Sequence, residues 1–174
     1  SITLTIPYVR TDMAANWSNF NGSLTVTGRD FRLNQATDFK GTAITLGDEV
    51  NMGHYKSGSG STLSLTTSIG SLATSATSAT VANGTYNVGY NNQNTTFAGK
   101  LACTDNTATV TIHQGAILAN NSSGTVATSI TVMDGAALYG KGHVKNVSLK
   151  KGSKLMAGQA TYLNGTLTIN GTLT

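Results

Sequence analysis

The sequence contains little of what builds helices or cross-links. Proline, glutamate and cysteine each occur once, as Pro7, Glu49 and Cys103, and 10% of the residues are charged, against roughly 25% in an average globular protein. A single cysteine can form no disulfide within the chain and cannot supply several thiolates to a metal. The scarcity of charged helix formers argues against a helical fold. No long apolar run is present, so we expect no transmembrane helix.

The chain is instead rich in threonine, serine, asparagine and glycine, which favour strands and turns. Its 174 residues fit a single domain, which we expect to span 1–174. The formal net charge of +4 reflects the small number of acidic residues rather than a high density of basic ones. Nucleic-acid binders carry denser Lys and Arg with aromatic residues between them, so we expect no nucleic-acid partner.

Short triplets of an apolar, a hydroxyl and an apolar residue recur along the chain. The first three, Leu4-Thr5-Ile6, Leu24-Thr25-Val26 and Ile44-Thr45-Leu46, lie 20 residues apart. The series continues with Leu63-Ser64-Leu65, Tyr86-Asn87-Val88 (a weaker member), Val110-Thr111-Ile112, Ile130-Thr131-Val132, Val147-Ser148-Leu149 and Leu167-Thr168-Ile169. Because side chains alternate along a strand, the apolar members of a triplet would point inward and the hydroxyl outward.

A period near 20 residues predicts a solenoid in which successive triplets stack in register. Two inward columns, one starting at Leu4 and one at Ile6, would run the length of the chain and bury a core that no single repeat could bury. We therefore predict an all-β fold, a right-handed single-stranded parallel β-helix with about 20 residues per coil. The alternative is a β-sandwich, whose strands would recur at roughly 8–12-residue spacing without a long-range register.

A second short strand is expected after the glycine that follows several triplets. These strands are Phe31-Arg32-Leu33, Val50-Asn51-Met52, Ala116-Ile117-Leu118, Ala136-Ala137-Leu138 and Lys154-Leu155-Met156. The less regular segment 69–108 is interpreted as longer coils, with the following residues facing inward: Ile69, Leu72, Val81, Tyr86, Val88, Phe97 and Leu101. Outward pairs of short polar residues are expected at Thr109/Thr111, Ser129/Thr131, Asn146/Ser148 and Thr166/Thr168.

Three stretches, 16–34, 84–101 and 130–158, resemble autotransporter-type β-helix repeats. The form strand-x-x-G-a-x-L-x-G-x-G matches Val132 to Gly142, and the turn T-F-x-G-x-L matches Thr96 to Leu101. The resemblance covers nearly the whole chain. It implies a β-helix of the pectate-lyase-like class and a Gram-negative bacterial protein that is exported to the cell surface or secreted.

The function that the resemblance implies is that of a non-catalytic structural and interaction module, a stalk or passenger segment, adhesive in some relatives. The alternative is a carbohydrate-active β-helix, or the tail of one, that binds or cleaves acidic polysaccharide. The chain begins and ends inside strand-like runs, so we expect a segment of a longer protein. Its expected partners are surface glycans, other proteins, or further copies that pair with open strand edges at the solenoid ends.

A contact surface for an acidic glycan is predicted in the last third of the chain, where lysines and two tyrosines gather. Its candidate residues are Tyr139, Lys141, Lys145, Lys150, Lys151, Lys154 and Tyr162. The ammonium groups would pair with carboxylates, and the tyrosine rings would stack on sugar rings. A row of solvated lysines is the alternative interpretation. Trp17 and Phe20, by contrast, are expected to fill a corner of the core.

The acidic residues are too dispersed to predict a catalytic pair, since a glycosidase needs two carboxylates that face each other. Asp30, Asp48 and Glu49 could meet on neighbouring coils and hold Ca²⁺, which prefers carboxylate oxygens. The alternative is that they are solvated turn residues. Arg29 and Arg32 flank Asp30 and are expected with it in a solvated polar corner.

The three histidines are far apart in the sequence, and His54 is expected in a flexible loop. No pair of them has the spacing of a zinc site. A polysaccharide lyase would need a cluster of acids with a basic residue, and its motifs are not recognisable here. No catalytic residue, metal or cofactor is therefore assigned.

Overall fold

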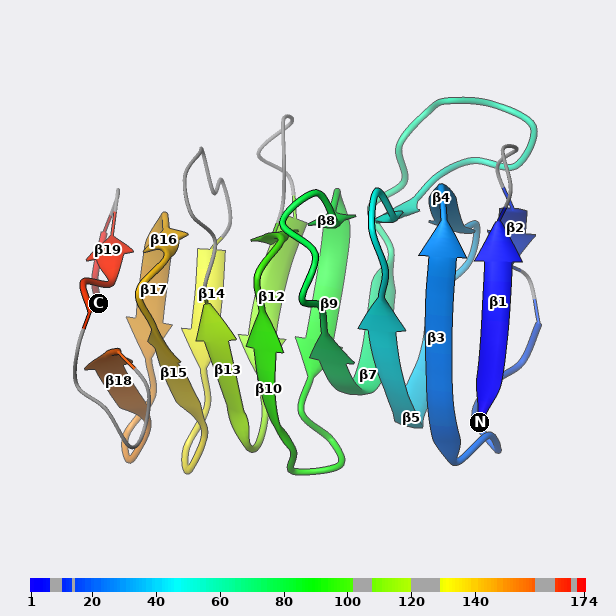
Figure 1. Cartoon of the computed structure of the whole chain (residues 1–174). Coiled ribbons are helices and arrows are strands. Elements are labelled where there is room, and N and C mark those ends of the chain that lie inside the picture. The colour runs from blue at the N-terminus through cyan, green and yellow to red at the C-terminus, as the bar shows by residue number, and fades with distance from the viewer. Residues whose placement is uncertain (7–10, 14, 102–107, 120–128, 159–164, 170–171) are drawn as a thin grey trace.

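The computed structural model describes residues 1–6, 11–13, 15–101, 108–119, 129–158, 165–169 and 172–174. These residues form strands and turns, and none of them lies in a helix that could cross a membrane. The sheets are parallel and stack into a solenoid of about seven turns (Figure 1). In Figure 1 the front strands run upward, the rear strands run downward and the chain advances from right to left, so the coil is right-handed. The predicted right-handed parallel β-helix is confirmed, and the β-sandwich is excluded.

Parallel sheets form the walls of the solenoid. The largest contains, in spatial order, β1 (Ile2–Ile6), β3 (Gly22–Gly28), β5 (Thr37–Leu46), β7 (Thr66–Ala73), β9 (Gly84–Val88), β12 (Ala108–Ile112), β14 (Ser129–Val132) and β17 (Asn146–Leu149). A second contains β10 (Asn94–Phe97), β13 (Ala116–Ala119), β15 (Ala137–Gly140) and β18 (Lys154–Ala157). A third contains β11 (Lys100–Leu101), β8 (Thr80–Val81), β6 (Asn51–His54), β4 (Asp30–Leu33) and β2 (Thr11–Met13). A fourth pairs β16 (His143–Val144) with β19 (Thr168–Ile169).

The largest sheet passes from one wall of the solenoid to another at β5 and β7. Residues 37–39 of β5 pair with 67–69 of β7, and residues 43–45 pair with 71–73, with a shift of register between the two stretches. The second stretch continues β1 and β3 and connects to β10 through the Thr74–Phe97 bridge. The first stretch leads into β9, β12, β14 and β17. We call the wall of β1, β3, β10, β13, β15 and β18 the front face, and the wall of β9, β12, β14 and β17 the rear face (Figure 1).

Part of the predicted register is confirmed. On the rear face two inward columns pair as predicted: Tyr86–Val110–Ile130–Val147 and Val88–Ile112–Val132–Leu149. The triplets at Leu24 and Ile44, however, pair with each other and then with Leu72 on the front face. The prediction of one continuous column is therefore wrong. Every wall repeats the same alternation of apolar and polar residues, so a triplet does not identify the wall to which it belongs.

Three predicted rungs are misplaced. Leu4 pairs with Val26 rather than with Leu24. Leu63-Ser64-Leu65 lies outside the sheets, and β7 supplies that rung with Ile69 and Leu72. Leu167-Thr168-Ile169 contributes β19, which pairs with β16, whereas Val147 of β17 forms a bridge with Leu173. A long polar loop or a change of wall alters which strand a triplet pairs with. Neither changes the spacing of about 20 residues between triplets in the sequence.

The core lies between the walls and is built around one cluster of buried apolar side chains. All the residues predicted to face inward in segment 69–108 are buried, with Leu101 the most exposed at 3%. The second strands are confirmed as β4, β6, β13, β15 and β18, although they belong to two different sheets. The ring of Trp17 lies 5.6 Å from that of Phe20 and 5.4 Å from that of Phe39, which confirms the predicted aromatic corner.

The lower edge of the solenoid in Figure 1 is built from stacked turns. One turn follows β12 and contains Gly115, and the equivalent turn after β14 contains Gly135. Both glycines have left-handed backbone, with φ of 66° and 75°, which L-residues rarely adopt. The amide of Met133 donates to the carbonyl of Ile112 at 2.9 Å, so one turn lies directly on the other. This edge of the molecule therefore repeats from coil to coil.

Candidate functional site

Four titratable side chains from three coils meet at the lower edge of the molecule. Asp38 and Lys40 come from β5, Tyr90 from the turn after β9 and His113 from the turn after β12. We call these four residues the lower corner. It combines an ion pair, a cation–π contact and a stacked pair of rings, and its first and last members lie 75 positions apart in the sequence.

The lower corner is a stack of three groups. The ammonium of Lys40 lies 5.2 Å above the centroid of the Tyr90 ring, within the range of a cation–π contact. The opposite neighbour of Tyr90 is His113, with ring centroids 4.7 Å apart and an interplanar angle of 23°. The Tyr90 hydroxyl lies 3.4 Å from Nε2 of His113. Asp38 completes the group, since its carboxylate lies 3.6 Å from the Lys40 ammonium and accepts the Lys40 amide at 2.9 Å.

The strand register brings these residues together. Phe39, Ile69, Val88 and Ile112 are successive inward partners, and the residue after each of them, or after Val88 the second residue, Tyr90, reaches the lower edge. On the coil between Lys40 and Tyr90 that residue is Gly70, so no side chain projects there. A Cβ at Gly70 would lie 2.7 Å from the carbonyl oxygens of Lys40 and Thr42, so the close approach of the backbones requires glycine.

The electrostatics of the lower corner depend on the charge of His113. Partial burial, and after it the charge of Lys40, lower the pKa of His113 below its ordinary value of 6.5. At neutral pH the imidazole is therefore uncharged, and Lys40 and Asp38 balance each other. Protonation of His113 would give the corner a net positive charge. Tyr90, His113 and Asp38 are half-buried and Lys40 is exposed, so a solute can reach all four side chains.

The lysines and tyrosines predicted to contact a glycan are divided between two edges and the front face. Lys141 and Lys145 flank β16 near the upper edge of Figure 1, whereas the turn that carries Lys150 and Lys151 lies at the lower edge. The structure brings Tyr139 and Lys154 together on the front face, because Tyr139 pairs with Met156 and Lys154 with Ala137 two residues earlier. Tyr162 lies outside the described residues.

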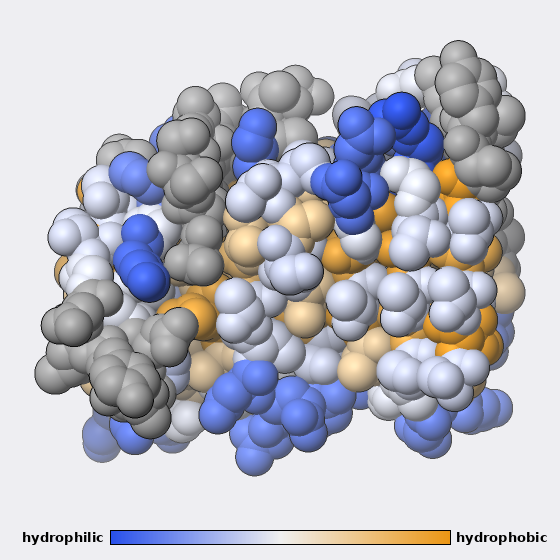
Figure 2. Space-filling view, viewed as in Figure 1, coloured by the Kyte–Doolittle hydropathy of each residue, from blue (hydrophilic) through white to orange (hydrophobic). Residues whose placement is uncertain are grey.

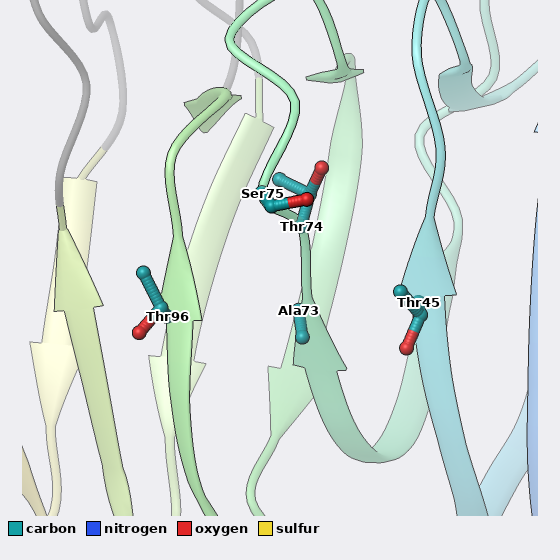
Figure 3. A pocket seen from close by; sticks show the side chains of 5 residues that line it. All are labelled: Thr45, Ala73, Thr74, Ser75 and Thr96. Carbon is teal, nitrogen blue, oxygen red and sulfur yellow. The ribbon is translucent and has the colours of Figure 1, made fainter.

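The front face also has a shallow hollow. Ala73 stands between Thr45 and Thr96 in one outward row, and its short side chain leaves a hollow of about 290 Å³. Figure 3 shows Thr45, Ala73 and Thr96 on three neighbouring strands, with Thr74 and Ser75 closing the upper end. Hydroxyls and methyl groups line it, and none of its five residues is charged.

The rear face presents the predicted outward pairs of short polar residues. Thr109/Thr111, Ser129/Thr131 and Asn146/Ser148 lie in register on consecutive rungs, and the rows extend to Thr85/Asn87 and Thr66/Ser68. The Thr109 hydroxyl donates to that of Thr85 at 3.1 Å, and the Asn146 amide to the Ser129 hydroxyl at 3.4 Å. The predicted pair Thr166/Thr168 is not part of these rows, because β19 pairs with β16.

The three acids considered for Ca²⁺ are engaged separately. Glu49 pairs with Arg29 at 2.8 Å, and Asp48 accepts a hydrogen bond from Ser78. The register partner of Asp30 is Asn51, so the expected stacking of Asp30 beside Asp48 is wrong. Within the described ranges no three His, Cys, Asp or Glu side chains gather into a group that could hold a metal ion.

Arg32 is not part of a solvated corner as expected, but is buried, with 2% of its surface exposed. Its guanidinium donates to the carbonyl oxygens of Lys56, at 3.4 Å, and Ser59, and lies 4.5 Å from the ring centroid of Tyr55. The loop after β6 therefore folds over the outer side of β4 and covers Arg32. Sequence reasoning missed this contact, because nothing in the loop sequence indicates which strand it covers.

His54 is also buried rather than placed in a flexible loop. It ends β6, pairs with Leu33 and, like Leu33, is fully covered. Its Nε2 lies 2.8 Å from the Thr67 hydroxyl and its Nδ1 3.3 Å from the Asn83 carbonyl oxygen. The prediction failed because β6 extends to His54, whereas the glycine- and serine-rich residues start only at Ser57.

Comparisons with family models, curated proteins and solved structures returned no match to this chain. The parallel β-solenoid is therefore the level at which the chain can be classified, and the autotransporter and pectate-lyase resemblance stays a proposal.

Proposed function

We propose that the chain is a non-catalytic structural and interaction module, a β-helical stalk or passenger segment of a bacterial protein exported to the cell surface or secreted. The observation that carries the proposal is the rear face. Five consecutive rungs present pairs of short uncharged side chains in register, so that wall is regular and polar. Such a wall, stiffened by parallel strand pairing and a continuous core, supports the display of loops and edges along a rod.

Two measurements test this role. A lyase assay on polygalacturonate with Ca²⁺ should give no ultraviolet-absorbing unsaturated product, and its appearance would refute the non-catalytic role. Antibody against the chain should label intact bacterial cells that produce the full-length protein, or detect it in the medium. Labelling that requires permeabilised cells would refute export.

A second candidate function is the binding of acidic polysaccharide, favoured by the pairing of Tyr139 with its neighbours. Tyr139 is half-buried on the front face between Leu118 and Met156, with Lys154 on the adjoining strand. We call Leu118, Tyr139, Met156 and Lys154 the front-face shelf. An apolar surface with a cation beside it suits a sugar ring that carries a carboxylate. A glycan array that includes acidic and neutral glycans would test this candidate. The double variant Tyr139→Leu, Lys154→Met should lose the acidic ligands that the unmodified chain retains.

Self-association through the solenoid ends is proposed as well. Among the described residues, the large apolar side chains that are exposed are Ile2, at 40%, and Leu173, at 52%. Ile2 lies on β1, a strand at the edge of its sheet, and Leu173 bridges to Val147 near the other end. Exposed strand edges beside apolar side chains favour pairing with another chain.

A further inference from the structure

We propose that the lower corner, Asp38, Lys40, Tyr90 and His113, binds a carboxylate-bearing sugar residue of an acidic glycan. This inference rests on the interaction role proposed above, but it uses residues other than those of the front-face shelf. The Tyr90 ring would support the apolar face of the sugar ring, and Lys40 would pair with its carboxylate.

The ring platform follows from the stacking order. His113 holds one side of Tyr90 at a centroid distance of 4.7 Å, so the tyrosine ring is fixed in orientation. The Lys40 ammonium lies over the ring at 5.2 Å, and Gly70 places no side chain on the intervening coil. Lys40 is long and its side chain is 51% exposed, so it can leave the ring and meet a carboxylate without moving the backbone. A sugar ring can then stack where the ammonium was.

Hydrogen-bonding groups surround this platform. Asn92, Gln93 and Gln114 are exposed in the turns next to Tyr90 and His113, and their amides can donate to and accept from sugar hydroxyls. Figure 2 shows hydrophilic side chains gathered along the lower edge of the molecule, below β10, where the β9–β10 connection runs. A combination of one aromatic platform, one mobile cation and several amides is suited to a sugar that is both hydroxylated and acidic.

The charge of the corner makes binding depend on pH. With His113 neutral, Asp38 competes with the ligand carboxylate for Lys40 at 3.6 Å. Protonation of His113 adds a positive charge beside Tyr90 and favours an anionic ligand. On its other side His113 adjoins the next turn, which presents the uncharged Met133 and the exposed Asp134, with Lys150 one coil further. The Asp134 carboxylate lies next to Gly152, on the side away from Tyr90.

The test is an NMR titration of the whole chain with a linear galacturonate trimer, followed through the ring protons of Tyr90 and His113 at pH 5.5 and pH 7.5. We expect both rings to shift, tighter binding at the lower pH and a higher His113 pKa in the complex. Lys40→Met should weaken binding about fivefold, as for a partly exposed charge pair. Lys100→Met, which removes an exposed lysine from β11, is the matched control and should leave the affinity unchanged. The fully methyl-esterified trimer carries no free carboxylate. Its affinity for the unmodified chain should be no higher than the affinity of the acidic trimer for Lys40→Met.

Each contrary result has its own meaning. The assignment of the site would be overturned if Lys40→Met and His113→Gln both bound the trimer as tightly as the unmodified chain. It would also be overturned if the ring-proton signals of Tyr90 and His113 did not shift. If Tyr139→Leu with Lys154→Met abolishes binding instead, the glycan occupies the front-face shelf and the lower corner carries no site. An unsaturated product in the lyase assay would refute the non-catalytic role whatever the titration gives. Lys40→Met changes only an exposed side chain, so its effect on affinity can be measured without a loss of folding.

Discussion

The imidazole of His54 stacks on the ring of Tyr86, with ring centroids 5.0 Å apart and both side chains fully covered by the surrounding walls. The Tyr86 hydroxyl donates to the Ala82 carbonyl at 2.8 Å, so the phenol keeps its proton and burial raises its pKa. Both buried polar side chains are thus hydrogen-bonded, Tyr86 to its own coil and His54 to Thr67 and Asn83 further along the chain.

Acid should destabilise the fold through His54. Burial lowers the pKa of His54 below 6.5 in the folded chain, and a hydrogen bond to the Asn83 backbone only partly offsets this. The unfolded chain therefore binds the proton more readily, so stability is greatest above pH 6.5 and falls as the pH drops toward the folded pKa. Urea unfolding at pH 7.5 and 5.0 should show this loss. His54→Gln should be less stable at pH 7.5 but lose less between the two pH values, whereas His143→Gln should keep the slope of the unmodified chain.

Removing the Arg32 guanidinium should release the loop that covers it. Arg32→Leu leaves the carbonyls of Lys56 and Ser59 without their buried donor, and each hydrogen bond from a charged group is worth about 1.5–3 kcal/mol. Trypsin should then cleave after Lys56 several times faster. The matched control is Arg29→Leu, which breaks the exposed pair with Glu49 and should change stability by no more than about 0.5 kcal/mol. Equal cleavage of both variants would contradict the clamping role of Arg32.

Two glycines in equivalent turns should tolerate alanine unequally. A Cβ at Gly115 would lie 2.3 Å from the Gln93 carbonyl oxygen, whereas one at Gly135 meets nothing within 4 Å. Both substitutions strain a left-handed backbone by roughly 1–2 kcal/mol. Gly135→Ala should cost about that amount, and Gly115→Ala should cost clearly more because the backbone of the preceding coil must move. Thermal unfolding of the two variants measures the difference in stability. Similar losses of stability would contradict the prediction and show that the backbone at Gln93 moves away from a new Cβ at little cost.

Association through the ends should depend on the exposed apolar residues there. We expect the apparent molar mass from light scattering to rise with protein concentration. Ile2→Lys combined with Leu173→Lys should suppress the rise, because association would bury a lysine at each strand edge and thereby oppose pairing. Thr25→Lys places the same charge on β3, a front-face strand that is paired on both sides, and serves as the control. A strictly monomeric unmodified chain would refute the proposal.

The sequence was sufficient for the fold because the period is carried by many residues at once. Each triplet indicates a strand with inward apolar side chains, as at Leu24, Ile44, Val110 and Ile130. The spacing between triplets indicates the length of a coil. Which wall a triplet belongs to was not predictable, since the crossing at β5 and β7 depends on a register shift between Phe39 and Ala43 that has no local signature. Loop length, not strand pattern, decides where the chain returns to a wall.

The site was far less predictable than the fold. Tyr90 is recognisable in sequence as an aromatic residue near a turn. Its partners Lys40 and His113 belong to other coils, and only the three-dimensional register reveals that they reach the same edge. Arg32 was misjudged for the same reason, because a charged residue on an outward position is solvated only if no loop folds over it.

The coils differ in length while their register is kept. Val147 follows its partner Ile130 by 17 residues, whereas Leu72 follows Ile44 by 28, and much of the excess forms the long loop after β6, at the upper edge of Figure 1. The turns after β12 and β14 at the opposite edge stay short and stack directly on each other. A solenoid of this kind can accept insertions along one rim at little cost to its neighbours. That rim is the natural place for sequence diversification, and for an engineer to graft a foreign peptide without unwinding the coil.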